Sequence, residues 1–183
     1  MLFRSYILAY QFPRAFVEQQ GWLPPIFASS FVGGFGAVML VDYHRSDAGP
    51  YRELLFTPGQ FEINGQRFYS ITKIYVSTWA SVVNGRQNWG IPKEFADFNL
   101  TSQPDGSTRV QVSQNGQDFA DFVLKTGRLS LPVTTAIIPA ALRTLIEMWD
   151  EKTYFTTPNG HGQVRPARDR KSTRLNSSHR IRY

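Results

Sequence analysis

The sequence contains no cysteine, which excludes disulfides, thiolate nucleophiles and thiolate metal sites. Histidine is nearly as scarce, because the three present, His44, His161 and His179, are too few and too scattered for a histidine metal cluster. The phosphate-binding Gly-x-x-x-x-Gly-Lys-Ser/Thr loop, the Gly-x-Ser-x-Gly elbow and the His-Glu-x-x-His helix are also absent. These absences point away from the common hydrolases, and nothing in the sequence implies a metal ion or an organic cofactor.

Long apolar runs are lacking as well. Residues 26–41 carry no charge, but this segment is shorter than the roughly 20 residues of a membrane-spanning helix, and serines and glycines interrupt it. The apolar stretch near the N-terminus is too short for a secretory signal and has no small-residue cleavage site. We therefore expect a cytoplasmic protein without a membrane partner.

Positive charge is concentrated at the C-terminal end. The net charge is +6, but residues 169–183 hold five basic side chains against one acidic one. The rest of the chain has no basic cluster, so we expect no nucleic-acid partner. Residues 169–179 match the translation of a DNA-sequencing adapter at eleven consecutive positions. We therefore expect one domain over residues 1–168, incomplete at its C-terminus, followed by a non-native, disordered tail over 169–183.

Short apolar runs separated by turn residues predict a mostly antiparallel β protein. Asn64-Gly65, between two such runs, is typical of a hairpin. A short helix is expected after Pro13, and a second, amphipathic helix over Pro139–Asp150, where Leu142, Leu145, Ile146 and Trp149 recur at helical spacing. The expected fold class is α+β, a barrel-like meander with one or two short helices. The predicted strands are residues 2–10, 35–43, 51–57, 60–63, 67–76, 95–103, 108–114, 117–126 and 128–132.

The segment Gly85-Arg86-Gln87-Asn88-Trp89-Gly90-Ile91-Pro92-Lys93-Glu94-Phe95 carries the most chemical information. Pro92 favours an extended backbone, so alternation places Lys93 and Glu94 on opposite faces of a strand. If Lys93 points inward, the loss of water disfavours its ammonium form and supplies a free amine that can attack a carbonyl carbon. If it points outward, it is an ordinary surface lysine. The sequence leaves both registers open.

This segment resembles the acetoacetate decarboxylase family, because Gly85-Arg86-Gln87 and Pro92-Lys93 fall at the family's spacing. Tyr51-Arg52-Glu53-Leu54 and Ile74-Tyr75-Val76 also look like segments of that family, and the resemblance extends over most of residues 1–165. It implies that Lys93 forms a Schiff base with a β-keto acid. It also implies that full-length members assemble, so we expect a homo-oligomer of the complete protein.

The resemblance implies roles for two further residues. Glu53 lies in the Tyr-x-Glu segment, where the family has a glutamate, and we expect it to act as the acid/base group. Arg4 matches a family arginine near the first strand and is expected to bind substrate. One position departs from the family, since a second lysine follows the first in the decarboxylase, whereas this chain has Glu94. A carboxylate near Lys93 would stabilise the ammonium form and oppose catalysis, although opposite strand faces limit this effect.

The aromatic residues Trp89 and Tyr75 either line an apolar pocket for the substrate or belong to the core. The expected reaction is decarboxylation of a small-molecule β-keto acid through an imine on Lys93. An imine withdraws electrons from the adjacent carbon whichever bond breaks, so aldolase or dehydratase chemistry on a related keto acid is an alternative. A non-catalytic module that binds a small ligand, with Lys93 as counter-ion, is another.

Overall fold

The computed structural model of the chain describes residues 2–140 and 143–169. Its contacts divide into two compact units, Met1–Phe95 with Thr135–Gly160, and Ala96–Thr134 with His161–Tyr183. The expected non-native tail lies, apart from Asp169, outside the described residues.

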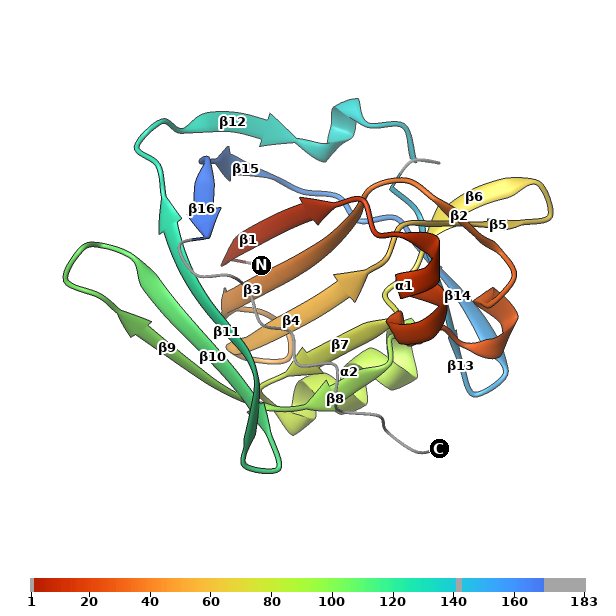
Figure 1. Cartoon of the computed structure of the whole chain (residues 1–183), viewed down its shortest axis with the longest axis horizontal. Helices are drawn as coiled ribbons and strands as arrows, with labels where there is room; N and C mark the ends of the chain where they lie inside the picture. The colour runs from red at the N-terminus through yellow and green to blue at the C-terminus, as the bar shows by residue number, and fades with distance from the viewer. Residues whose placement is uncertain (1, 141–142, 170–183) are drawn as a thin grey trace. The chain divides into compact units, whose positions relative to one another are not determined.

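The first unit contains a five-stranded sheet with the order β1-β3-β4-β7-β8 (Figure 1). Neighbouring strands are antiparallel except for β7 and β8, which are parallel. The strand predicted over residues 35–43 corresponds to β3, which is central in the sheet because it pairs with β1 on one side and β4 on the other. The strands are β1 (Leu2–Tyr10), β3 (Gly36–Arg45), β4 (Tyr51–Thr57), β7 (Lys73–Val76) and β8 (Lys93–Phe95).

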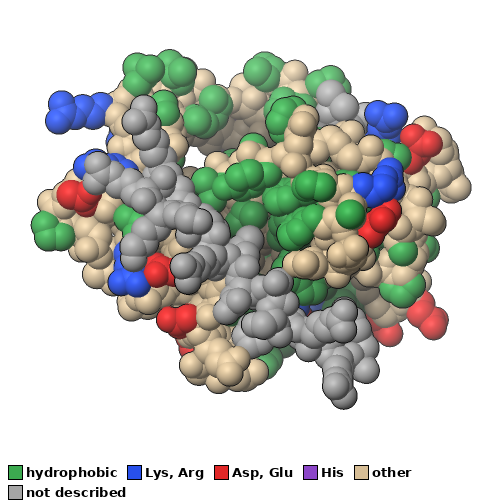
Figure 2. All heavy atoms as spheres, in the orientation of Figure 1, with side chains coloured by type: hydrophobic (Ala, Val, Ile, Leu, Met, Phe, Trp, Pro, Cys, Tyr) green, Lys and Arg blue, Asp and Glu red, His purple; other side chains and the backbone are tan. Residues whose placement is uncertain are grey.

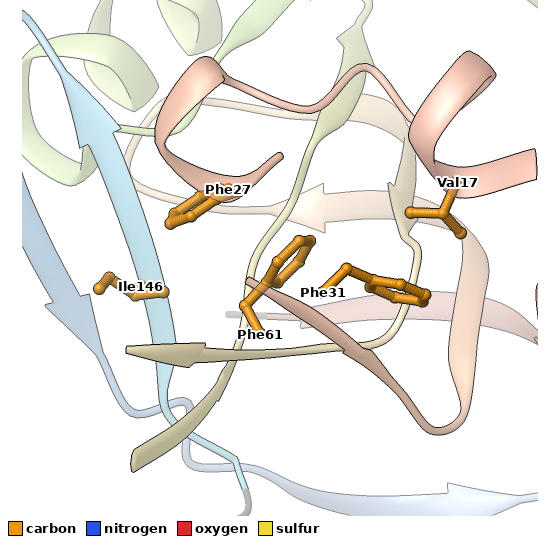
Figure 3. Close-up of a cluster of buried hydrophobic side chains, with 5 residues drawn as sticks. All are labelled: Val17, Phe27, Phe31, Phe61 and Ile146. Carbon is orange, nitrogen blue, oxygen red and sulfur yellow. The ribbon is translucent and has the colours of Figure 1, made fainter. Parts of the chain in front are cut away.

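A second five-stranded sheet of this unit has the order β14-β13-β6-β5-β2. The hairpin predicted at Asn64-Gly65 joins β5 to β6, and both turn residues have positive φ. Helix α1 (Arg14–Gln20), predicted after Pro13, and the short helix η1 (Pro25–Phe27) contribute Val17 and Phe27 to the core of this part. Figure 3 shows these two side chains gathered with Phe31, Phe61 and Ile146. The strands are β2 (Phe31–Gly33), β5 (Gln60–Ile63), β6 (Gln66–Tyr69), β13 (Leu145–Trp149) and β14 (Lys152–Thr156).

The helix predicted over Pro139–Asp150 is wrong: Leu145–Trp149 forms strand β13, and Leu142 lies outside the described residues. β13 pairs with β14 along its length, and Asp150 and Glu151 between them both adopt positive φ, as a type I′ hairpin turn requires. Ile146 packs into the aromatic cluster around Phe61. Packing and strand pairing therefore outweigh the helical spacing of the apolar residues.

Glu147 on β13 is a buried carboxyl group. Its Oε1 accepts the Ile71 backbone N–H at 2.7 Å, and its Oε2 accepts the Ser70 hydroxyl at 3.2 Å. Burial raises the pKa of Glu147 to about 8. Ser70–Thr72 separate β6 from β7, where the sequence predicted one continuous strand over residues 67–76. Glu147 thus partners the backbone at the point where the predicted strand breaks.

Helix α2 (Trp79–Trp89), which the sequence analysis did not predict, covers one face of β7 and β8. Thr78 caps its first turn, because the Thr78 hydroxyl accepts the Ser81 N–H at 3.3 Å. Gly90 ends the helix in the left-handed conformation, with φ of 66°. Val82 packs against Ile74 and Val76 of β7.

The second unit contains a four-stranded sheet, β16-β11-β10-β9, and the two-stranded pair β12-β15. β10 and β11 occupy the predicted ranges, because Asn115-Gly116 forms the turn between them. Val110, Val112 and Phe122 form the interior of this sheet. The strands are β9 (Asp97–Ser102), β10 (Thr108–Gln114), β11 (Gln117–Thr126), β12 (Leu131–Thr134), β15 (His161–Val164) and β16 (Ala167–Asp169).

The predicted α+β class, mostly antiparallel with few helices, is confirmed. The barrel-like closure is not found: within residues 2–140 and 143–169, each of the four sheets keeps two edge strands. None of the helices in this part of the chain combines the length and the hydropathy that a transmembrane span requires. On the face in Figure 2, the described Lys and Arg side chains are spread out and form no single patch.

Candidate active site

Lys93, the first residue of β8, is 7% exposed. β8 runs beside β7 with Lys93 opposite Ile74, and helix α2 covers that face of both strands. Of the two registers that the sequence left open, the structure therefore has the inward one. The charged side chain of Lys93 therefore has little access to water.

The Gly-Arg pair of α2 has a direct structural explanation. A Cβ atom at Gly85 would lie 2.4 Å from Cδ of Lys93, so the absence of a side chain there makes room for the lysine. Arg86 donates from Nε to the backbone carbonyl of Lys93 at 2.8 Å, and its guanidinium lies 4.9 Å from the ring centroid of Trp149. Gly85 thus leaves room for the Lys93 side chain, and Arg86 holds the Lys93 backbone in place.

The Lys93 amine contacts three oxygen atoms. Nζ lies 3.1 Å from Ser81 Oγ, 3.4 Å from the Tyr51 hydroxyl and 3.4 Å from Glu53 Oε2. The ring of Tyr51 also lies against the amine, with its centroid 4.9 Å from Nζ. An ammonium group has three N–H donors, so these oxygens satisfy the charged form, and Glu53 balances its charge.

Glu53 on β4 is 5% exposed and is held from its other side by Tyr43. The Tyr43 hydroxyl donates to Oε1 at 3.3 Å, which leaves Oε2 facing Lys93. Tyr43 and Tyr51 are cross-strand neighbours whose rings stack at 4.6 Å. Burial raises the pKa of both phenols, and the charge of Glu53 raises it further. The pKa of Tyr51 reaches about 12. Both phenols keep their protons near neutral pH, so the carboxylate beside Lys93 is that of Glu53.

Glu94, the departure from the family pattern, lies on the opposite face from Lys93, as strand alternation predicted. Its Oε1 is 2.5 Å from Nζ of Lys73, a buried lysine that also lies over the Tyr75 ring at 5.0 Å. Burial, and then the charge of Glu94, raises the pKa of Tyr75. Glu94 is therefore paired with Lys73 on the far face of the sheet and not with Lys93.

The three expected substrate-binding residues are not gathered around the amine. Directly opposed residues on paired strands share a face of the sheet. Arg4 lies opposite Asp42 in the strand register, and Glu53 lies opposite Val41. Successive residues of a strand face opposite ways, so Arg4 lies on the face away from Glu53. Tyr75 pairs with Glu94 and lies on that same far face. Trp89 ends helix α2 and is 46% exposed. A role for these three in binding stays a prediction.

The sequence model of the acetoacetate decarboxylase family matches residues 15–138. This chain belongs to the acetoacetate decarboxylase family. The family match spans β4, which carries Glu53, and β7, α2 and β8, which carry the lysine motif. No curated protein matches the chain.

Solved structures agree with the family in fold. An acetoacetate decarboxylase from Legionella pneumophila superposes with a TM-score of 0.60 at 16% identity, covering 94% of this chain and 70% of that one. The enduracididine biosynthesis enzyme MppR, complexed with pyruvate, superposes with a TM-score of 0.54 at 17% identity, covering 79% of this chain and 62% of that one. The same enzyme with the condensation product of pyruvate and imidazole 4-carboxaldehyde has a TM-score of 0.52 at 16% identity, covering 89% of this chain and 66% of that one. This chain therefore spans about two thirds of the length of such family structures.

Several contacts of the site were missed by sequence reasoning. Ser81 and Tyr43 were not singled out, because a serine or tyrosine in an apolar run carries no signal of its own. A signal for helix α2 was present, since Thr78 and Gly90 bracket an eleven-residue segment as N-cap and C-terminal glycine. The interior Gly85 and two β-branched valines weaken that helical pattern. Among the described residues, no group of three His, Asp or Glu side chains is placed to hold a metal ion.

Proposed function

We propose that this chain is a Schiff-base-forming lyase that decarboxylates a β-keto acid through an imine on Lys93. The observation that carries the proposal is a buried amine beside a buried carboxylate, with Nζ of Lys93 and Oε2 of Glu53 3.4 Å apart. Membership of the acetoacetate decarboxylase family supports the same chemistry.

The pair of side chains accounts for the protons of imine formation. Transfer of a proton from the Lys93 ammonium to Glu53 leaves a neutral amine and a neutral acid, so no net charge is created in the buried site. The amine then attacks the ketone carbon, and the protonated Glu53 returns its proton to the departing hydroxyl, which leaves as water. The product is an iminium ion whose positive charge faces the ring of Tyr51.

Loss of carbon dioxide follows from the electron demand of the iminium. The electron pair of the bond to the carboxyl carbon moves into the iminium and gives an enamine. A proton that Glu53 takes from water and delivers to that carbon restores the iminium, and a second water molecule then releases the ketone and the free Lys93. Glu53 is the acid/base group for these transfers, since the neighbouring phenols keep their protons.

Aldolase or dehydratase chemistry on a related keto acid is the second candidate. It is favoured by the similarity to MppR, whose structures contain pyruvate and a condensation product of pyruvate with an aldehyde. The same iminium on Lys93 would deliver its electrons to an aldehyde in place of losing carbon dioxide. In this alternative, Lys93 and Glu53 keep their roles.

Borohydride trapping tests the proposal. With acetoacetate, we expect release of carbon dioxide and a reduced covalent adduct on the peptide that contains Lys93, and neither in Lys93→Arg. Lys73 is an internal control, because it is also buried beside a carboxylate but lies on the other face. An adduct without carbon dioxide release, together with condensation of pyruvate and an aldehyde, would favour the second candidate. Binding without an adduct would leave only a ligand-binding module.

A further inference from the structure

Ser81 provides the oxygen atom nearest to the reactive amine. Its Oγ lies 3.1 Å from Nζ of Lys93, and the residue is 1% exposed. Its position is fixed at the start of α2, where the Ser81 N–H donates to the Thr78 hydroxyl at 3.3 Å. Gly85 lies one turn further along the same helix face and leaves room for the lysine. The helix therefore holds the Ser81 hydroxyl beside the amine of Lys93, whose side chain packs against Gly85.

The Ser81 hydroxyl also interacts with Tyr51. The Ser81 side chain lowers the pKa of Tyr51, against the rise that burial causes. The Ser81 and Tyr51 hydroxyls both contact Nζ of Lys93. A hydroxyl both accepts and donates a hydrogen bond, which a protonated amine cannot do. Ser81 is thus placed to accept a proton from nitrogen and donate its own to another oxygen.

Imine formation requires such a transfer. When the Lys93 amine attacks a ketone, nitrogen becomes positive and the former carbonyl oxygen becomes negative, and one proton must pass from the first to the second. Direct transfer closes a strained four-membered ring of N, H, O and C. Passage through a hydroxyl closes a six-membered ring, because the hydroxyl accepts one proton while it donates another.

We propose that Ser81 is a catalytic residue that carries this proton from Nζ of Lys93 to the carbonyl oxygen. The N–H bond breaks and its proton forms a new bond to Oγ, while the original O–H bond of Ser81 breaks and its proton forms a bond to the substrate oxygen. Ser81 is unchanged, the carbinolamine is neutral, and no co-reactant is consumed. This inference rests on the proposed Schiff-base function.

Glu53 is not free for the same step. Its Oε2 has already taken the proton that released the amine, and its Oε1 is occupied by the Tyr43 hydroxyl. The Tyr51 hydroxyl is the other candidate near Nζ, but it lies further away, at 3.4 Å against 3.1 Å for Ser81. If Ser81 carries the proton, Ser81→Ala slows adduct formation and Tyr51→Phe does not. If Tyr51 carries it, the reverse holds.

The test measures the rate at which Lys93 forms an adduct with pentane-2,4-dione, a β-diketone that has no carboxylate to lose. Samples are quenched with borohydride over time, and the adduct is quantified by intact mass. In Ser81→Ala we expect a rate lower by roughly 100-fold with an unchanged final yield, because a proton carrier changes the rate and not the equilibrium. Ser81→Thr, which keeps the hydroxyl, should recover most of the rate. Alanine keeps the N–H that Thr78 accepts, so the helix cap remains.

Val83→Ala is the matched control, because Val83 lies on the same helix with 50% exposure and faces away from the site. It should react at the wild-type rate. A wild-type rate in Ser81→Ala, a Ser81→Thr variant as slow as Ser81→Ala, or a large loss confined to Tyr51→Phe would overturn the role of Ser81. If the unmodified protein forms no adduct at Lys93, the proposed function fails, and this inference fails with it. An adduct that forms equally fast in Ser81→Ala removes this inference alone.

Discussion

Lys93 and Glu53 form an ion pair between strands that are not neighbours in the sheet. Lys93 is on β8 and Glu53 on β4, and β7 lies between these two strands. The 3.4 Å contact between Nζ and Oε2 therefore passes over β7, beneath helix α2. Since both side chains are buried, each depends on the other to balance its charge.

Removal of one partner should destabilise the chain more than removal of both. Lys93→Met leaves the Glu53 carboxylate buried without a counter-charge, and we expect the free energy of unfolding to fall by about 3–5 kcal/mol. The double variant Lys93→Met, Glu53→Gln should recover most of that loss. Urea unfolding at pH 7 measures both, with Lys125→Met at an exposed site as control. Equal losses in the single and double variants would contradict the buried-pair interpretation.

Glu53→Gln should reduce turnover of the keto acid by roughly 100- to 10,000-fold, because the amide cannot accept the proton of Lys93 or return it to the leaving hydroxyl. Glutamine keeps the shape of the side chain and the bond from Tyr43. The measurement is the steady-state rate of carbon dioxide release. Glu62→Gln, which alters an exposed glutamate paired with Arg67, serves as the control and should retain full activity. Retention of activity in Glu53→Gln would remove Glu53 from the mechanism.

Gly85→Ala should impair chemistry more than stability. Alanine favours a helix interior over glycine by about 1 kcal/mol, which offsets part of the strain. The new Cβ would lie 2.4 Å from Cδ of Lys93, so the lysine side chain must move and carry Nζ away from its oxygen partners. We expect a fall of at least about 10-fold in the rate of adduct formation. Gln87→Ala, exposed on the same helix, is the control. An unchanged rate in Gly85→Ala would show that the lysine does not need the space left by Gly85.

Glu147 makes stability depend on pH. Its pKa rises from 4.5 to about 8 on folding, so between these values the unfolded chain releases a proton that the folded chain retains. Stability therefore falls as pH rises through this range, by about 4 kcal/mol at pH 8. Glu147→Gln, which resembles the protonated form, should flatten this dependence and exceed the wild type in stability at pH 8. Melting temperatures from pH 5 to pH 9 test this, and parallel curves for the two proteins would contradict it.

Arg4→Ala and Tyr75→Phe should leave adduct formation at Lys93 within about 2-fold of the wild type. Both side chains lie on the sheet face away from Lys93. The buried lysine on that face is Lys73. Borohydride-trapped adduct from acetoacetate is the readout. A large rise in KM in either variant would instead support the substrate-binding role expected from the family resemblance.

The sequence by itself determined the features that depend on neighbouring residues. Asn64-Gly65 and Asn115-Gly116 specify tight turns because these residues tolerate positive φ, so the strands around them were predicted closely. Alternation along an extended segment likewise separates Lys93 from Glu94 without any knowledge of the fold. The motif around Lys93 and the Tyr-x-Glu segment named the two central residues of the candidate site.

Only the tertiary structure decided which way Lys93 points and which groups meet it. Residues 145–149 show that apolar spacing alone cannot distinguish a helix from a strand, because pairing with β14 and packing on Phe61 supply the energy that selects one. Ser81 reaches the amine because α2 folds over β7, and Lys73 reaches Glu94 across paired strands. Burial and charge balance arise between segments distant in sequence, and local residue patterns do not encode such distances.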